Sequence, residues 1–508
     1  MELELERTQL NGFENVLDTM VYHEETLEMI VPDACPDILR IVDTEGNVCL
    51  KGKEAQEGRA EISGTVRAAV LYLPDGAEGL RRLEVTIPFT CSADGAGITG
   101  ACALVALPQV QAAETRSLNP RKVLVRVNLA VGLQVFAPMT ENLCGGVTTS
   151  AEAGVEQLVE QQDTYLTVSI QEKPFTFSDD ISISASRPEA EELLKSRIGL
   201  LCTESKVIGN KLIFKGEAAL RLLYRGSGGT LCTAEFELPF SQIMEITGAG
   251  EEADCTVEVI LTNAECTLSG GDGRTVAVSL GLLAQAVVRE RQSMSLLSDV
   301  YATSCTLNAE TKSFTLCHLL DRGIKSQTAR EILETGVLAQ EVCDAYAAVG
   351  AVVQNREGER LTLTAEVSVT VVYQAEEEGL YAVTRKIPVT CPMELPENCT
   401  CSCVCHCPGE VYATPTTGGL EVRLAVDFQY MALSSRKVCA VDAIQVNETV
   451  QPEEGERPSI VLRMAQHGER LWDIAKAYGT TISDIVSANE LEETETTEDK
   501  LLLIPRKR

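Results

Sequence analysis

A repeated pattern constrains the fold of this chain more than any other feature. Three segments, spaced by about 150 residues, each contain an alternating apolar run ending near a tyrosine, a polar turn, and a second alternating run that reaches a proline. The pairs are Tyr72 and Pro88, Tyr224 and Pro239, and Tyr373 and Pro388. Two alternating runs around a polar turn are typical of a β-hairpin. We expect the proline to end the second strand, because it has no N–H to donate.

Each repeat contains two further elements. A long alternating run after the hairpin predicts another half-buried strand. A shorter run before the hairpin has leucine and isoleucine at helical spacing, flanked by proline or glycine, and predicts a short helix. The predicted strands are 122–135, 274–288 and 420–433, and the predicted helices are 35–43, 187–199 and 328–336.

These patterns predict a mainly β protein with three repeated β-rich domains, each a sandwich or a barrel with one short helix. A small C-terminal module should follow an acidic, proline-containing linker. The expected boundaries are 1–150 for the first domain with an N-terminal extension, 160–300 for the second, 301–448 for the third, 449–458 for the linker and 459–508 for the module. A second linker is expected at 144–157.

Charge and termini narrow the class of protein. The formal net charge of −32 argues against binding nucleic acid or an anionic membrane, because both require a basic face. The start MELELERTQLNGFENVL does not have the features of a secretion signal, and no apolar run is long enough to predict a transmembrane segment. We therefore expect a cytoplasmic protein whose 19 cysteines are reduced and mostly act as small apolar side chains.

The sequence offers little chemistry. The four histidines, at 23, 318, 406 and 467, are not at metal-binding spacing, and no nucleophile motif is present. We expect a protein without catalytic residues or a cofactor. The stretch CTCSCVCHC would place five thiols on one face of a strand, too far apart to share one zinc unless a turn gathers them. A cysteine-rich strand, a thiolate metal site and oxidative cross-linking all remain open for Cys399, Cys401, Cys403, Cys405 and Cys407.

The C-terminal residues have a regular order of elements. The segment SIVLRM alternates like a strand, and Leu471, Ile474 and Tyr478 share one helix face. Gly479 should end that helix, and Thr481 should cap a second one. KLLLIP predicts a final strand, so the expected order is βααβ.

That pattern resembles the lysin motif (LysM) domain, through Gly468, Leu471, Trp472, Ile474, Ala475, Tyr478, Gly479, Thr480, Ile485, Asn489 and the ending LLLIP. Glu469 and Arg470 depart from the usual small polar residues of the first loop. The resemblance implies a groove for glycan or a protein partner formed by Gly468, Glu469, Arg470, Leu471, Asn489, Glu490 and Leu491. It places Trp472, the only tryptophan, in the core with Ile474 and Tyr478.

The whole chain is similar to clostridial sporulation proteins that combine SPOCS domains with a LysM domain, through the hairpins and VPDACPDILRIV (31–42). The resemblance implies a non-enzymatic adaptor in the mother-cell cytoplasm at the forespore surface or spore coat. It would bind the coat-basement ATPase, stage IV sporulation protein A, and other coat proteins. The alternative is a protein of the cell wall or cortex that binds peptidoglycan through its LysM.

Overall fold

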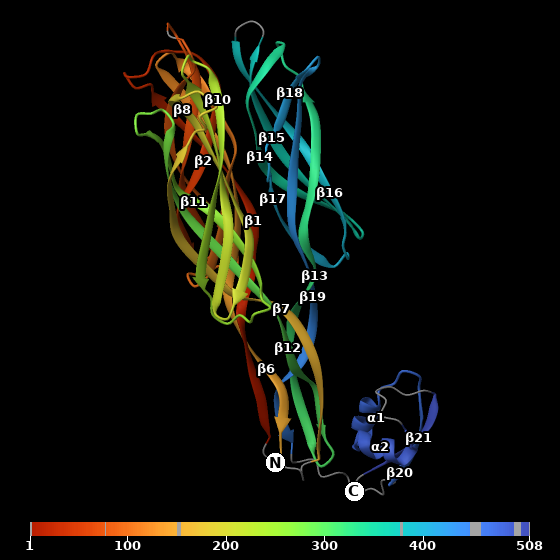
Figure 1. Cartoon of the computed structure of the whole chain (residues 1–508). Coiled ribbons are helices and arrows are strands. Elements are labelled where there is room, and N and C mark those ends of the chain that lie inside the picture. Colours follow the sequence, from red (N-terminus) through yellow and green to blue (C-terminus); the bar gives the residue numbers. More distant parts are fainter. Residues whose placement is uncertain are drawn as a thin grey trace.

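The chain is almost entirely β-structure. The computed structural model describes residues 3–76, 78–149, 154–375, 379–447, 459–491 and 499–506. Within these ranges, the two helices both lie in the C-terminal module (Figure 1). No helix among them is long and apolar enough to span a membrane. The prediction of a mainly β fold is confirmed.

The three repeats share one order of strands. A long first strand is followed by a three-stranded meander, then by one or two further strands, and finally by a long last strand. The first repeat contains β1 (Glu4–Ile30), β2 (Ile38–Gln56), β3 (Arg59–Pro74), β4 (Arg81–Asp94), β5 (Ala103–Asn119) and β6 (Lys122–Thr148). The second contains β7 (Val155–Ser182), β8 (Ala190–Ile208), β9 (Lys211–Gly226), β10 (Leu231–Glu245), β11 (Asp254–Ser269) and β12 (Thr275–Ala302). The third contains β13 (Thr306–Leu333), β14 (Ala339–Glu357), β15 (Arg360–Ala375), β16 (Gly379–Glu394), β17 (Cys399–His406), β18 (Tyr412–Thr416) and β19 (Gly419–Asn447).

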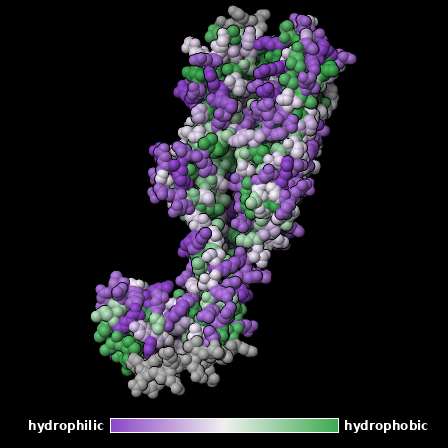
Figure 2. All heavy atoms as spheres, turned by 180° about the vertical axis from the view of Figure 1, so that it is seen from behind, coloured by the Kyte–Doolittle hydropathy of each residue, from purple (hydrophilic) through white to green (hydrophobic). Residues whose placement is uncertain are grey.

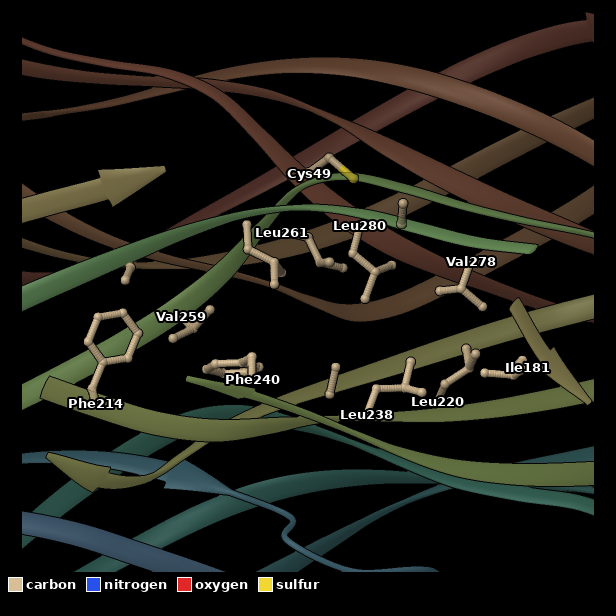
Figure 3. Packing of buried hydrophobic residues seen from close by; sticks show 14 of the residues in the cluster. Cys49, Ile181, Phe214, Leu220, Leu238, Phe240, Val259, Leu261, Val278 and Leu280 are labelled. Atoms are coloured by element: carbon tan, nitrogen blue, oxygen red, sulfur yellow. The ribbon is translucent and has the colours of Figure 1, made fainter. Parts of the chain in front are cut away.

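Each repeat is a sandwich of two sheets. The meander forms one sheet, in the orders β2-β3-β4, β8-β9-β10 and β14-β15-β16. The long first and last strands pair antiparallel and form the other sheet, together with β5, β11, or β17 and β18. In the second repeat, Phe214 and Leu238 of the meander face Val259 and Leu280 of the opposite sheet (Figure 3). Alternating apolar residues therefore meet in one core between two sheets.

The helix predicted in each repeat is wrong, and β-bulges explain the error in the first and second repeats. Residues 35–43 form a turn and the start of β2, 187–199 lead into β8, and 328–336 cover the end of β13. Two bulges interrupt the start of β2, at Ile38/Arg40 and Ile41/Asp43. Each bulge adds a residue to the strand, so Ile38 and Ile41 both face the core at a spacing typical of a helix. β8 and β14 have bulges at the equivalent positions. The segment 328–336, however, lies before β14, at the end of β13, where the pairing with β19 has no bulge from Asp321 to Leu333.

The prolines of the repeat do not end their strands. Pro88, Pro239 and Pro388 lie inside β4, β10 and β16. These are edge strands of the three-stranded sheets, and an edge strand tolerates a residue without an N–H because one of its sides has no ladder partner. The strands therefore continue beyond each proline.

The repeated tyrosine has a structural role. Tyr72 and Tyr224 are fully buried, and their hydroxyls donate to the carbonyls of Pro36 (3.3 Å) and Pro188 (3.2 Å). Each bond ties the end of the hairpin to the turn that begins the meander. In the third repeat, Tyr373 instead stacks on Tyr381, with ring centroids 6.0 Å apart.

The long strands β1, β6, β7, β12, β13 and β19 extend beyond the meanders, and these extensions run together as a narrow stalk (Figure 1). Its core is apolar and draws on all three repeats: Leu143, Met294, Leu296, Phe314, Leu316 and Ala440. A pairing between Phe13 and Thr167 joins the first two repeats in a six-stranded sheet. The linker expected at 144–157 is strand at both of its ends, because β6 continues to Thr148 and β7 begins at Val155. The linker predicted at 449–458 lies outside the described residues.

Candidate binding surface of the C-terminal module

The module has the predicted βααβ order. It contains β20 (Ile460–Ala465), α1 (Leu471–Tyr478), α2 (Ile482–Asn489) and β21 (Lys500–Pro505), with the two strands paired antiparallel. Gly479 ends α1 in the left-handed region (φ 65°), where its N–H bonds to the last carbonyls of the helix. The Thr481 hydroxyl caps α2 by accepting from the Asp484 N–H at 3.1 Å.

The module core contains the residues expected there. Trp472 is 5% exposed and Ile474 is fully buried, and both pack with Ala465, Ile485 and Ile504. Tyr478 is half-buried, with the guanidinium groups of Arg463 and Arg506 at 5.5 and 5.3 Å from its ring centroid. Trp472 is therefore not free to stack on a ligand.

The first loop of the predicted groove is open and charged. Gly468 and Arg470 are exposed, and Gly468 adopts a φ of 80°. Arg470 makes two hydrogen bonds to the Asp473 carboxylate, at 3.0 and 3.1 Å. Glu469 pairs with Arg463. Leu471 is only 1% exposed and belongs to the core.

In the second loop of the predicted groove, Asn489 and Leu491 make contacts within the module, and Glu490 is exposed. The Asn489 side-chain amide donates to the Leu503 carbonyl (2.6 Å) and accepts from the Leu503 N–H (2.7 Å), which fixes α2 to β21. Glu490 is exposed at a φ of 51°, and Leu491 packs against the module core. Of the seven predicted groove residues, Gly468, Arg470 and Glu490 are therefore the exposed ones.

Sequence reasoning missed a second surface, the outer face of the β20–β21 sheet. Ile460, Leu462, Met464 and Leu501 are 52–66% exposed, although all four are apolar. Leu462 lies opposite Leu503, and Met464 lies opposite Leu501. Figure 2 shows the apolar patch on the module. The uninterrupted apolar run LLLI in β21 was the available signal, because such runs indicate a strand covered on both faces.

The inner part of the module docks against the stalk. The indole N–H of Trp472 donates to the Asp299 carboxylate at 2.8 Å, and Lys476 pairs with the same carboxylate at 2.7 Å. The Tyr301 hydroxyl donates to the Thr480 carbonyl at 2.8 Å, and its ring meets Trp472 edge-on at 4.9 Å. Burial would raise the pKa of Asp299, but the bonds from Lys476 and Trp472 lower it overall.

Four of the five clustered cysteines lie on β17 and Cys407 directly follows it; together they face the core of the third repeat. Cys405 is buried, and the other four thiols pack against the same cluster. Burial raises the pKa of Cys401 and of Cys407 to about 12, which disfavours the thiolate that metals and oxidants need. The described residues contain no group of histidine, cysteine and acidic side chains placed to hold a metal, and all 19 cysteines are free thiols. These observations favour the cysteine-rich strand among the three interpretations.

A small cavity of about 100 Å³ lies between the second and third repeats. Its lining includes Cys202, Cys255 and Glu258 from one repeat, and His406 and Gln429 from the other. Burial raises the pKa of Glu258 to about 7, and burial also lowers the pKa of His406, although Asp427 opposes that shift. Both groups therefore favour their neutral forms.

Comparison with known families identifies two kinds of domain. The family model described as "SipL, SPOCS domain" matches residues 37–112 and 189–269, within the first and second repeats. The model described as "LysM domain" matches residues 466–495. No curated protein and no solved structure matches the chain. The domains found are binding or adaptor domains without known catalytic roles.

Proposed function

The chain belongs to the SPOCS and LysM domain family of sporulation proteins, and we propose that it serves there as a non-enzymatic assembly adaptor. Its LysM module binds the coat-basement ATPase, stage IV sporulation protein A, while the three repeats form a rigid body that carries other coat proteins. It acts in the mother-cell cytoplasm, at the forespore surface.

The observation that carries this proposal is the apolar outer face of β20 and β21. A glycan is recognised by polar groups and exposed aromatic rings, whereas a protein interface has a desolvated apolar centre. Leu462 and Met464 are 66% and 65% exposed, so they are available as such a centre. Trp472, the only tryptophan, is buried and bonded to Asp299.

A second candidate function rests on the LysM match itself. LysM domains are associated with peptidoglycan, and the exposed Gly468, Arg470 and Glu490 border the groove expected for a glycan. In that case the module would hold the protein at the cell wall or spore cortex. The two candidates use different surfaces of one module, so single substitutions can separate them.

The test uses the full chain and two binding assays. The affinity for purified stage IV sporulation protein A is measured by calorimetry, and binding to insoluble peptidoglycan is measured by co-sedimentation. Leu462→Glu places a charge at the apolar centre, and we expect it to weaken binding of the ATPase by about tenfold or more. Arg470→Ala should leave that affinity unchanged.

Ile324→Glu is the matched control, because Ile324 is 63% exposed but lies on β13 of the third repeat. Equal loss of ATPase binding in both glutamate variants would reject the outer face as the docking surface. Retention of the wild-type chain on peptidoglycan, lost in Arg470→Ala and without binding of the ATPase, would replace the adaptor by the second candidate.

A further inference from the structure

A buried ion cluster lies where the three repeats meet. Lys195 of the second repeat is 3% exposed, and its ammonium lies 2.8 Å from Asp43 and 2.9 Å from Glu45, both from the first repeat. It also lies 2.9 Å from Asp344 of the third repeat, which is 2% exposed. An ammonium has three donors, and each of them here meets a carboxylate from another repeat.

These charges occupy one equivalent position of the repeat. Asp43, Lys195 and Asp344 each follow the second of the two bulges in β2, β8 and β14. The interval from the first residue of the strand is the same in each case: 38 to 43, 190 to 195 and 339 to 344. A bulge changes the direction of the side chain beside it. Each repeat therefore has one side chain that points towards the other repeats, and its charge differs from repeat to repeat.

A second equivalent position repeats the arrangement two residues further on, with Glu45, Arg197 and Tyr346. Arg197 pairs with Glu45 and with Asp344, the latter at 3.2 Å. The Tyr346 hydroxyl donates to Asp43 at 3.0 Å, and its ring lies 4.6 Å from the Lys195 ammonium. The first repeat thus contributes two anions, the second two cations, and the third one anion and a tyrosine.

The pKa shifts favour the charged forms of Glu45, Asp344 and Lys195. Burial acts to raise the pKa of Asp344 and of Glu45, but Lys195 and Arg197 lower both overall. The surrounding carboxylates raise the pKa of Lys195 despite its burial. Each charge therefore depends on charges that only the other repeats supply.

We propose that this cluster selects which repeats may pack together, so that one repeat of each kind meets at the centre and packing of like repeats is excluded. Similar repeats with apolar inward faces could otherwise pack like against like, including between two molecules. Three copies of the first repeat would bring only carboxylates to the centre, and three copies of the second only cations. Buried charges contribute little net stability but can specify partner and register.

The experiment removes the three charges of the first equivalent position from the full chain; the charge-free variants lack these three charges and keep Glu45 and Arg197. The two variants are Asp43→Leu/Lys195→Met/Asp344→Leu and the closer shape match Asp43→Asn/Lys195→Met/Asp344→Asn. Unlabelled and nitrogen-15-labelled chains are unfolded, mixed, refolded and weighed by native mass spectrometry. We expect the wild type to refold as a monomer, and either charge-free variant to form about tenfold more mixed oligomer. The surface control is Glu366→Leu/Lys386→Met, which removes an exposed pair.

The remaining outcomes overturn the proposal. A charge-free variant that folds and stays monomeric would show that the charges do not select partners. If neither charge-free variant folds, while Lys195→Arg keeps the native melting temperature, the cluster stabilises the repeats and does not select among them. If the surface control also forms mixed oligomers, the loss of any charged pair promotes oligomers and the buried cluster has no special role.

Discussion

Glu258 shows how one side chain sets a pH dependence. Burial in the cavity raises its pKa to about 7, above the value of about 4.3 in an unfolded chain. Between these values the folded chain holds a proton that the unfolded chain has lost, so the free energy of unfolding falls as pH rises and levels off above 7. We predict that Glu258→Gln raises stability by about 3–4 kcal/mol at pH 8 and changes it little at pH 4.

Denaturant unfolding at the two pH values checks this, with Glu237→Gln on the exposed side of β10 as the control. Equal effects of the two substitutions at pH 8 would show that Glu258 is solvated. The sequence gives no warning of Glu258, because its environment comes from His406 and Gln429 of another repeat. Trp472 could be placed in the core because its neighbours at helical spacing define one face.

The docking of the module on β12 can be tested through its tryptophan. Asp299 accepts from both Trp472 and Lys476, so Asp299→Ala leaves an indole N–H without its charged acceptor. We predict a loss of about 2–3 kcal/mol of docking energy. Trp472 is the only tryptophan, and its emission should shift to the red and become easier to quench with acrylamide.

Asp442→Ala, which removes the partner of Arg7 elsewhere on the stalk, should leave the emission unchanged. Because the pKa of Asp299 is lowered in the docked state, docking in the wild type should persist at neutral pH and weaken only as pH falls below about 4. An emission spectrum unaffected by Asp299→Ala would mean that the carboxylate does not hold the module.

At the level of strands, periodicity located the hairpins and the long strands but failed where bulges occur. A bulge in β2 puts Ile38 and Ile41 on one face, and sequence spacing alone cannot distinguish that from a helical turn. The prolines misled for a related reason, since whether a strand lies at an edge depends on the rest of the sheet. The apolar run of β21 correctly predicted a strand. That part of this run forms an exposed apolar surface could be seen only from the solvent exposure of its side chains.

For the whole molecule, the first two repeats should unfold together. They share a six-stranded sheet, and Cys49 of the first lies in the core of the second, while Ile260 of the second lies in the core of the first. We predict that Ile62→Ala, at a 1% exposed position, costs about 2–4 kcal/mol. Hydrogen exchange should then accelerate in β7 and β12 as well as in β3.

Ile243→Ala is the control, because Ile243 is 51% exposed and should change stability by less than about 0.5 kcal/mol. Faster exchange confined to the first repeat would show that the two repeats unfold independently. The sequence revealed three repeats but not this sharing, because contacts between repeats depend on side chains distant in the chain, such as the buried amide of Gln285 bonded to the backbone of Ala106.

The stalk has a mechanical consequence. In each repeat, the start of the first long strand pairs with the end of the last long strand. These pairs are Glu4 with Thr148, Val155 with Ala302, and Thr306 with Asn447. Tension between the N-terminus and the C-terminal module would therefore load every ribbon at its open end. Hydrogen-bonded pairs would separate in succession, as in a zipper, and not shear together. The protein would behave as an extensible tether that lengthens in steps and can close again when the load is removed.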